Sequence, residues 1–227
     1  MSALTALELD MLAEAFNIGL GLGSSALSEL LGEEIHVSVP GVKVLPKRPA
    51  IDECAQRYDT RAHTIRQAFI DAKGASAFSG DAFLFVPQPS SQVLTELLSN
   101  SEVTEAEVLA ELGNLILHSC LGSLANMMET ELDSELPEVH LNRSAELLIE
   151  IARNKNRGKA CEAGSETVAK ETKRRPLDLQ DKVLQLEVQF KTLEKNISGE
   201  IMLFLDLSRL PDLKIRIRDA IHRLTVP

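Results

Sequence analysis

The chain has 227 residues, of which 44% are hydrophobic and 26% charged, a composition typical of a globular protein with one large domain or two small ones. Its formal net charge of −10 disfavours nucleic acids and anionic membranes as main partners, because both recruit basic surfaces. The three cysteines, Cys54, Cys120 and Cys161, form no CxxC pair and predict reduced thiols, not a disulfide framework or a zinc site.

Two features of the chain bear on its location. The N-terminus lacks the basic region of a signal peptide and carries three acidic residues in its first 14 positions. The longest mostly apolar run, residues 115–128, contains His118 and Asn126 and is too short and too polar to span a bilayer. We therefore expect a cytoplasmic protein without membrane insertion.

The first predicted element is a long helix near residues 6–31, and its middle reads GLGLGSSA. An interior glycine costs about 1 kcal/mol relative to alanine, so these glycines need a reason. A nucleotide-binding loop is disfavoured, because no strand precedes the stretch and its spacing is not GxGxxG. We expect instead a close contact with a second helix, because small side chains let two helix axes approach. The residues expected at this contact are Gly19, Gly21, Gly23, Ser24, Ser25 and Ala26.

The same order of elements, a long helix, three strands and a short helix, is predicted in each half of the chain. After the first helix we expect strands near 35–46, 63–73 and 76–87, then a short helix after Pro89. A second long helix near 103–132 precedes strands near 138–151, 183–193 and 197–206. A closing helix has an apolar face, although its KIRIR stretch also fits a strand. That face consists of Leu213, Ile217, Ala220, Ile221 and Leu224.

The two halves also resemble each other residue by residue. An offset of 97 positions aligns six landmarks without a gap. They are Asp10, Glu14, Asn17, Leu27, Pro40 and Val42 in the first half, and Glu107, Glu111, Asn114, Leu124, Pro137 and Val139 in the second. Further along, SGDAFLFV at 79–86 resembles SGEIMLFL at 198–205, at an offset of 119. This pattern indicates an internal duplication, with repeat one at about 6–100 and repeat two at about 103–227.

The difference between the two offsets places an insertion of 22 residues in the second repeat. Residues 153–182 contain nine Lys or Arg against five Asp or Glu, with no aromatic residue, and this composition predicts a surface loop. We therefore expect residues 1–227 to form a single α+β domain with pseudo-twofold symmetry. Two long helices should lie side by side on a roughly six-stranded, mainly antiparallel sheet, with short helices added.

Each long helix carries a glutamate and an asparagine three residues apart, Glu14 with Asn17 and Glu111 with Asn114. Residues at this spacing project from one face of a helix. In a single copy, acidic residues near a helix start are explained by the helix dipole alone. Two copies, each with a proline 23 residues after the asparagine, make that explanation insufficient.

The full pattern is an acidic residue, three residues, Glu, two residues, Asn, 22 residues and Pro. It resembles the signature of the CheC / CheX / FliY family of CheY-phosphate phosphatases. It is met by Asp10, Glu14, Asn17 and Pro40, and again by Glu107, Glu111, Asn114 and Pro137. The two copies resemble the layout of CheC, and the likeness covers nearly the whole chain apart from the 153–182 insertion.

Two positions depart from the family pattern. Glu107 stands where aspartate or serine is usual, which should perturb little. Phe16 stands where a small residue is common, and we expect it to crowd the first site. The second site, with the sequence ELGN, should therefore carry more of the activity.

The resemblance implies an aspartyl-phosphate phosphatase that acts on a CheY-like response regulator in chemotaxis or another two-component pathway. An asparagine would hold the attacking water in line with the phosphorus. A glutamate would pair with the active-site lysine of the regulator. The regulator brings its own Mg²⁺, so the resemblance implies no metal or cofactor in this protein. The implied catalytic residues are Glu14, Asn17, Glu111 and Asn114, the docking residues Asp10 and Glu107, and the motif-structural residues Pro40 and Pro137.

Two other functions fit the same fold. One is a non-catalytic interaction module, because the related flagellar switch protein FliM lacks the paired motif and serves assembly. Retention of Glu and Asn in both halves argues against it. The other is an adaptor that binds CheD, on which no sequence feature reports.

Other catalytic arrangements are disfavoured by their spacing. His118, Ser119 and Cys120 are consecutive, so on a helix they point apart and cannot form a nucleophile and base pair. The remaining histidines have no metal-ligand spacing. They are His36, His63, His140 and His222.

Overall fold

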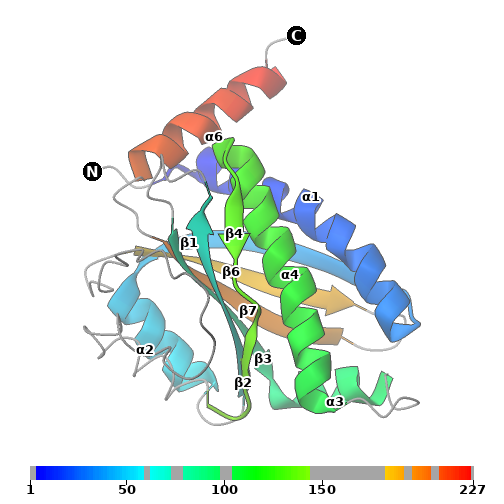
Figure 1. Ribbon diagram of the computed structural model, residues 1–227. Coiled ribbons are helices and arrows are strands. Elements are labelled where there is room, and N and C mark those ends of the chain that lie inside the picture. The colour runs from blue at the N-terminus through cyan, green and yellow to red at the C-terminus, as the bar shows by residue number, and fades with distance from the viewer. Residues whose placement is uncertain are drawn as a thin grey trace, which may run out of the picture.

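The computed structural model describes residues 4–58, 62–72, 79–97, 104–143, 182–191, 196–205 and 210–225. Figure 1 labels the helices and strands of this part of the chain. The helices are α1 (Ala6–Leu31), α2 (Lys47–Tyr58), α3 (Gln88–Leu97), α4 (Glu105–Met128) and α6 (Leu210–Thr225). The strands are β1 (His36–Pro46), β2 (Ala62–Asp71), β3 (Ser79–Pro87), β4 (Leu132–Ser134), β5 (Glu138–His140), β6 (Lys182–Lys191) and β7 (Asn196–Leu205).

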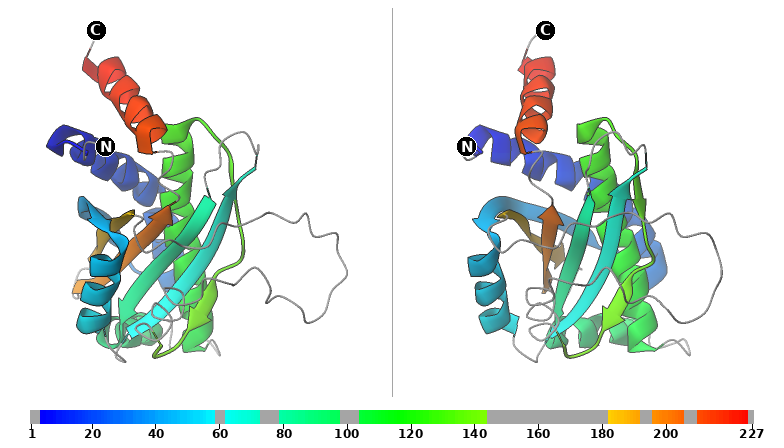
Figure 2. Two further views of the ribbon diagram at one scale, coloured as in Figure 1. Left: turned by 90° about the vertical axis from the view of Figure 1, so that its left-hand side faces the viewer. Right: turned by 60° about the vertical axis from the view of Figure 1, so that its left-hand side comes forward.

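These strands form one antiparallel sheet in the order β1-β6-β7-β3-β2-β4, with β5 also paired to β2. The long helices α1 and α4 lie side by side on one face of the sheet (Figures 1 and 2). Helix α2 packs on the other face. Helix α6 contacts α1 and α4. The arrangement confirms the predicted α+β fold with a mainly antiparallel sheet.

The strand pairing at the centre of the sheet has the symmetry expected of a duplicated chain. Strands β3 and β7 pair so that Phe83 lies opposite Met202. The offset of 119 between the repeats relates the same two positions. A pseudo-twofold axis therefore passes between them. Exchange of the repeats leaves the strand order unchanged, because β1, β2 and β3 then take the places of β5, β6 and β7.

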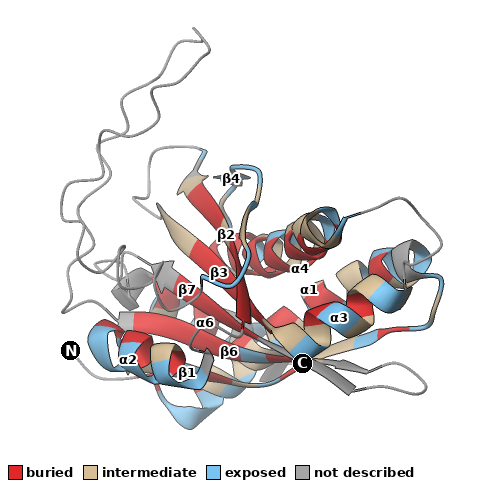
Figure 3. Cartoon of the chain, turned by 90° about the horizontal axis from the view of Figure 1, so that it is seen from below, coloured by how far each residue is buried: buried red, intermediate tan, exposed pale blue. Residues whose placement is uncertain are grey.

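The main core lies between the sheet and the pair of long helices. Buried residues recur along α1 with helical spacing, at Leu12, Phe16, Leu20 and Leu27. A smaller cluster on the opposite face joins α2 to the sheet through Cys54 and residues such as Phe83. Figure 3 shows buried residues on the strands and on the helix sides turned toward them. Burial also raises the pKa of the Cys54 thiol and raises that of Cys120 to about 12, and both cysteines are free.

Helix α4 is long and apolar enough to cross a membrane by length and composition, with a mean hydropathy of 1.4 over its most apolar 18-residue window. However, 61% of that window is buried inside the protein. Its buried residues include Leu112, Ile116 and Leu124, which belong to the core between helix and sheet. The apolar character of α4 is therefore that of a core helix.

Only some of the α1 residues that were predicted to contact the second long helix do so. A Cβ on Gly19 would lie 1.7 Å from Ser123 Oγ, and one on Gly23 would lie 2.5 Å from Ser119 Oγ, so both glycines sit at the contact with α4. The prediction is wrong for Gly21, which has no atom within 4 Å of such a Cβ. The prediction is also wrong for Ser24, Ser25 and Ala26. With 3.6 residues per turn, these positions lie on other sides of the helix than Gly19 and Gly23. Ser25 and Ala26 are exposed, and Ser24 Oγ donates to the carbonyl oxygen of Ile35.

Three elements differ from the sequence-based expectations. Helix α2 was not predicted, because its buried apolar face consists only of Ala50, Ile51 and Cys54. The three-residue strand β4 was not predicted either. The strand expected at 138–151 begins as β5, and its part beyond residue 143 lies outside the described residues. The insertion expected at 153–182 also lies outside them, apart from Lys182.

Candidate functional site

Site one lies on the outer face of α1. Asp10 and Glu14 are exposed and Asn17 is half-buried, while Leu12 and Phe16 between them face the core. In the described part of the chain, neither acidic residue forms an ion pair. Phe16 is 1% exposed, so the expectation that it crowds the site is wrong. Its ring fills the core because its position belongs to the inward-facing stripe of the helix.

The side chain of Asn17 is bound to the backbone of β1. Its Nδ2 donates to the Val39 carbonyl oxygen at 3.1 Å, and its Oδ1 accepts from the Val39 N–H at 2.7 Å. The amide thus pairs with Val39 as a second strand would. An amide can form four hydrogen bonds, so one Nδ2 proton and one lone pair of Oδ1 remain for another partner.

This pairing occurs at an irregularity of β1. The register against β6 shifts between Ser38 and Gly41, which leaves Val39 and Pro40 in a bulge. Asn17 supplies the partners that the ladder does not give to Val39, and Pro40 has no N–H that needs one. The interval between Asn17 and Pro40 in the motif therefore has a structural cause at site one.

Site two lies on the outer face of α4 and differs from site one. Glu111 is exposed, and Asn114 is half-buried. Among the described residues, Asn114 makes no side-chain hydrogen bond. The chain before Pro137 connects β4 to β5, and Leu136 in that connection is 85% exposed. With respect to the described residues, Asn114 thus keeps all of its hydrogen-bonding capacity.

Glu107, which the motif places beside site two, closes a capping box at the start of α4. Its carboxylate accepts from the backbone N–H and from the hydroxyl of Thr104, both at 2.8 Å. The backbone hydrogen bond from Thr104 is the main cause that lowers the pKa of the Glu107 carboxyl. The side chain is still exposed. Its position is explained by helix capping, and its part in docking stays a prediction.

Other chemistry on α4 is not favoured by the geometry. The Ser119 hydroxyl donates to the Leu115 carbonyl oxygen at 2.6 Å, while Cys120 is buried and His118 is exposed. The three side chains point apart, as the spacing predicts. Within the described ranges, no group of three or more His, Cys, Asp or Glu residues is placed to hold a metal ion.

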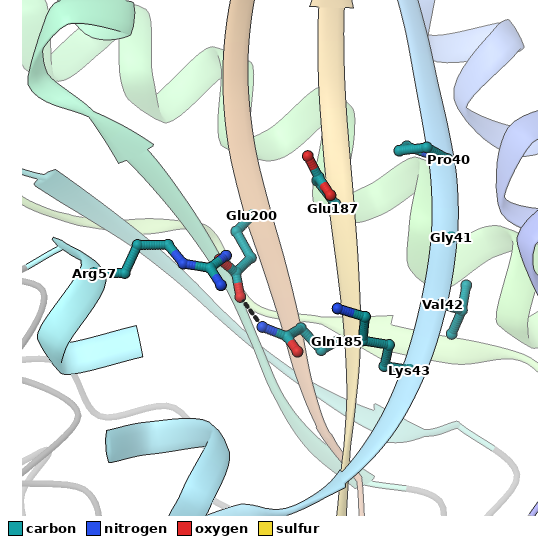
Figure 4. Close-up of a pocket in the computed structure, with 8 residues that line it drawn as sticks. All are labelled: Pro40, Gly41, Val42, Lys43, Arg57, Gln185, Glu187 and Glu200. Atoms are coloured by element: carbon teal, nitrogen blue, oxygen red, sulfur yellow. Dashed lines mark hydrogen bonds and ion pairs between the residues drawn. The ribbon is translucent and has the colours of Figure 1, made fainter. Parts of the chain in front are cut away.

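A pocket of about 270 Å³ lies on the face of the sheet opposite α1 and α4 (Figure 4). Arg57 Nη1 lies 2.9 Å from Glu200 Oε2, whose side chain is 2% exposed, and Gln185 Nε2 donates to the other oxygen of that carboxylate. Pro40 is the one motif residue that lines the pocket. The pocket is lined by Pro40, Gly41, Val42, Lys43, Arg57, Gln185, Glu187 and Glu200.

This polar group was not predicted from the sequence, although the sequence contains a signal for it. The acid after the SG dipeptide is shared by the two repeats, as Asp81 and Glu200. Each has an arginine partner, since Arg66 Nη2 lies 2.6 Å from Asp81 Oδ1. The two acids occupy equivalent positions of the repeats, but their partners Arg57 and Arg66 do not. The ion pairs could therefore not be predicted from the sequence.

No family model matches the chain. CheC of Bacillus subtilis strain 168, named a CheY-P phosphatase, is 28% identical over 145 residues, which are 60% of this chain and 66% of CheC. FliY of the same strain, named a flagellar motor switch phosphatase, is 24% identical over 147 residues, which are 61% of this chain but 36% of FliY. The matched part is thus just under two thirds of CheC and about one third of FliY.

Solved structures share the fold. FliY of Thermotoga maritima superposes with a TM-score of 0.61 and 17% identity, and the match covers 96% of this chain and 99% of that one. A chain of the FliG-FliM complex of H. pylori gives a TM-score of 0.58 at 10% identity, covering 93% of this chain and all of that chain. The sequence relatives confirm the resemblance to CheC and FliY that the duplicated motif indicates, and the solved structures show that the chain shares the fold of FliY.

Proposed function

We propose that the protein is an aspartyl-phosphate phosphatase that dephosphorylates a CheY-like response regulator. The observation that carries the proposal is the duplicated pair on α1 and α4, an exposed glutamate followed one turn later by a half-buried asparagine. The names of its relatives CheC and FliY support a phosphatase. Because the matched segment is less than two thirds of either relative, activity, substrate and cytoplasmic location are all part of the proposal.

The proposed chemistry uses the asparagines as neutral positioning groups. Hydrolysis of an acyl phosphate needs a water in line with the phosphorus and charge stabilisation on the phosphoryl oxygens. The regulator provides its own Mg²⁺ and lysine for the charge, so this protein needs no metal of its own. Because Asn114 has no side-chain hydrogen-bond partner among the described residues, its amide can offer a donor and an acceptor to the water.

Asn17 can act in the same way with the groups that Val39 leaves free. Its two hydrogen bonds to the backbone fix the plane of its amide before any substrate binds. The remaining Nδ2 proton and Oδ1 lone pair point to opposite sides of the amide, so one of them can orient the water, and the fixed amide plane favours a preorganised site. Site two has more hydrogen-bonding capacity and site one has the better-held side chain. We expect site two to carry more of the hydrolysis.

The glutamates are proposed to dock the regulator. Glu14 and Glu111 are exposed and, in the described part of the chain, make no ion pair. Each is therefore available to the active-site lysine of the regulator. Asp10 and Glu107 add negative charge one turn earlier. Glu111→Ala should weaken binding of the phosphorylated regulator more than it lowers the rate at saturation.

A non-catalytic module is the second candidate, because the fold is shared with a chain of a FliG-FliM complex. The proposals separate in one experiment. The protein is incubated with a panel of phosphorylated CheY-like receiver domains from its own genome, and phosphate release is measured against the receivers alone. Acceleration for at least one receiver supports the phosphatase, and its absence for every receiver favours the module.

A further inference from the structure

An apolar stripe continues the exposed face of α1 beyond Glu14. Ile18 is 64% exposed and Leu22 is 79% exposed, one and two turns after that glutamate. Their spacing of four residues places all three side chains along one line of the helix. Ala26, a further turn on, is exposed as well. A contiguous row of exposed apolar side chains on a helix marks an interaction surface.

Repeat two has no equivalent stripe. The offset of 97 places Leu115 and Ser119 where α1 has Ile18 and Leu22. Leu115 is half-buried and packs against the core, and Ser119 lies at the contact with Gly23. The two helices thus break the pseudo-twofold symmetry, because α4 turns this side toward α1. The exposed side of α4 carries Glu111 and His118, which are polar.

The occupant of the stripe can be deduced from the charges next to it. Asp10 and Glu14 stand at its N-terminal end. A complementary surface therefore has a basic group beside apolar side chains. A second copy of this chain fits poorly, because each copy carries a net charge of −10. An anionic membrane is disfavoured for the same reason.

We propose that Ile18 and Leu22 form the apolar half of a docking surface for the receiver domain of the regulator, and that this surface makes site one the tighter of the two. The proposal rests on the proposed function. The lysine of the receiver pairs with Glu14, and apolar side chains beside that lysine cover the stripe. Site two lacks such a contact and binds the same receiver more weakly.

The test measures binding without turnover. The full chain with Glu111→Ala, which weakens site two, is titrated with a receiver held in its active state by beryllofluoride. Adding Ile18→Ser and Leu22→Ser should raise the Kd at least about tenfold, because burial of two large aliphatic side chains contributes at least this much. Leu22→Ala alone should raise it by a smaller factor. The matched control is Ile215→Ser on α6, a residue that is 57% exposed and belongs to neither site, and it should leave the Kd unchanged.

An unchanged Kd in the folded Ile18→Ser, Leu22→Ser variant would overturn the docking surface. Light scattering provides a second test, since a wild-type dimer that dissociates in this variant would show that a second copy covers the stripe. Phosphate release separates this proposal from the proposed function. If no receiver is dephosphorylated while the difference in Kd persists, docking stands and the phosphatase fails. If phosphate release is normal and the Kd does not change, docking alone fails.

Discussion

The side-chain amide of Asn17 and the backbone of Val39 are joined by two hydrogen bonds, of 3.1 and 2.7 Å, across 22 positions of the chain. This pair ties helix α1 to edge strand β1 at the point where the strand bulges. The side chain expected to act in catalysis at site one thus also has a structural function. The corresponding Asn114 has none that the described residues show.

Asn17→Ala should therefore destabilise the protein. The substitution leaves both the N–H and the carbonyl oxygen of Val39, a residue that is 2% exposed, without the partners they have now. Loss of hydrogen bonds to partly buried backbone groups costs about 1–3 kcal/mol, which chemical denaturation can measure as a lower free energy of unfolding. Asn114→Ala is the matched control and should change that free energy by no more than about 0.5 kcal/mol. Equal effects of the two substitutions would contradict the structural function of Asn17.

Two glycines of α1, Gly19 and Gly21, should respond in opposite ways to substitution by alanine, one with a loss and the other with a gain of stability. In Gly19→Ala the new methyl group would meet Ser123 Oγ at 1.7 Å and the Ser119 carbonyl oxygen at 2.9 Å, and the latter belongs to the backbone. The two helices must then shift, and we expect a loss of about 1–3 kcal/mol of stability. Gly21→Ala adds a methyl group in open space and should increase stability by up to about 1 kcal/mol. Thermal unfolding of both variants tests this, and stabilisation by both would show that the helix contact is looser than described.

Much of the fold could be predicted from sequence because the duplication repeats each signal. The helix expected near 6–31 is α1, and the strand pairs around Phe83 and Met202 lie where the offset of 119 places them. The two elements that were not predicted, α2 and β4, have weak sequence patterns. Helix α2 buries only a narrow apolar face, and β4 has three residues, so neither stands out from a loop.

The site could be predicted only in part, for a physical reason. The pattern placed Glu14 and Asn17 on the outer face of α1, where the structure has them. The pattern could not show that Asn17 forms hydrogen bonds with the backbone of Val39. Those bonds form at a bulge of β1, and the bulge depends on the register between β1 and β6. The pattern also could not reveal that repeat two lacks this pairing, since both repeats have the same spacing to proline.

Stability should fall in mildly acidic solution because of His63. This side chain is 1% exposed, and its burial is the main cause that lowers its pKa, while Glu105 Oε1 at 3.3 Å from Nε2 acts in the opposite direction. The unfolded state takes up a proton near pH 6.5, but the folded state resists until a lower pH. The free energy of unfolding is therefore expected to decrease as the pH falls below about 6.5.

The pH dependence is checked by denaturation of the wild type and two variants between neutral and mildly acidic pH. His63→Gln should flatten the decrease, because it removes the titrating group. His118→Gln on the exposed side of α4 should keep the decrease as it is in the wild type. If the free energy of unfolding of His63→Gln decreased with falling pH as steeply as that of the wild type, other groups would be responsible for the decrease.

If the asparagines position the attacking water, they determine the rate of phosphate release at saturating phosphorylated regulator. Asn114→Ala should lower this rate while the Kd for the beryllofluoride-activated receiver stays unchanged, because the group acts only in the transition state. The variant with both Asn17→Ala and Asn114→Ala should lose at least about 100-fold of the accelerated rate and approach the rate of the regulator alone. Chemical denaturation must show that the double variant is still folded. A folded double variant with the full rate would contradict the mechanism.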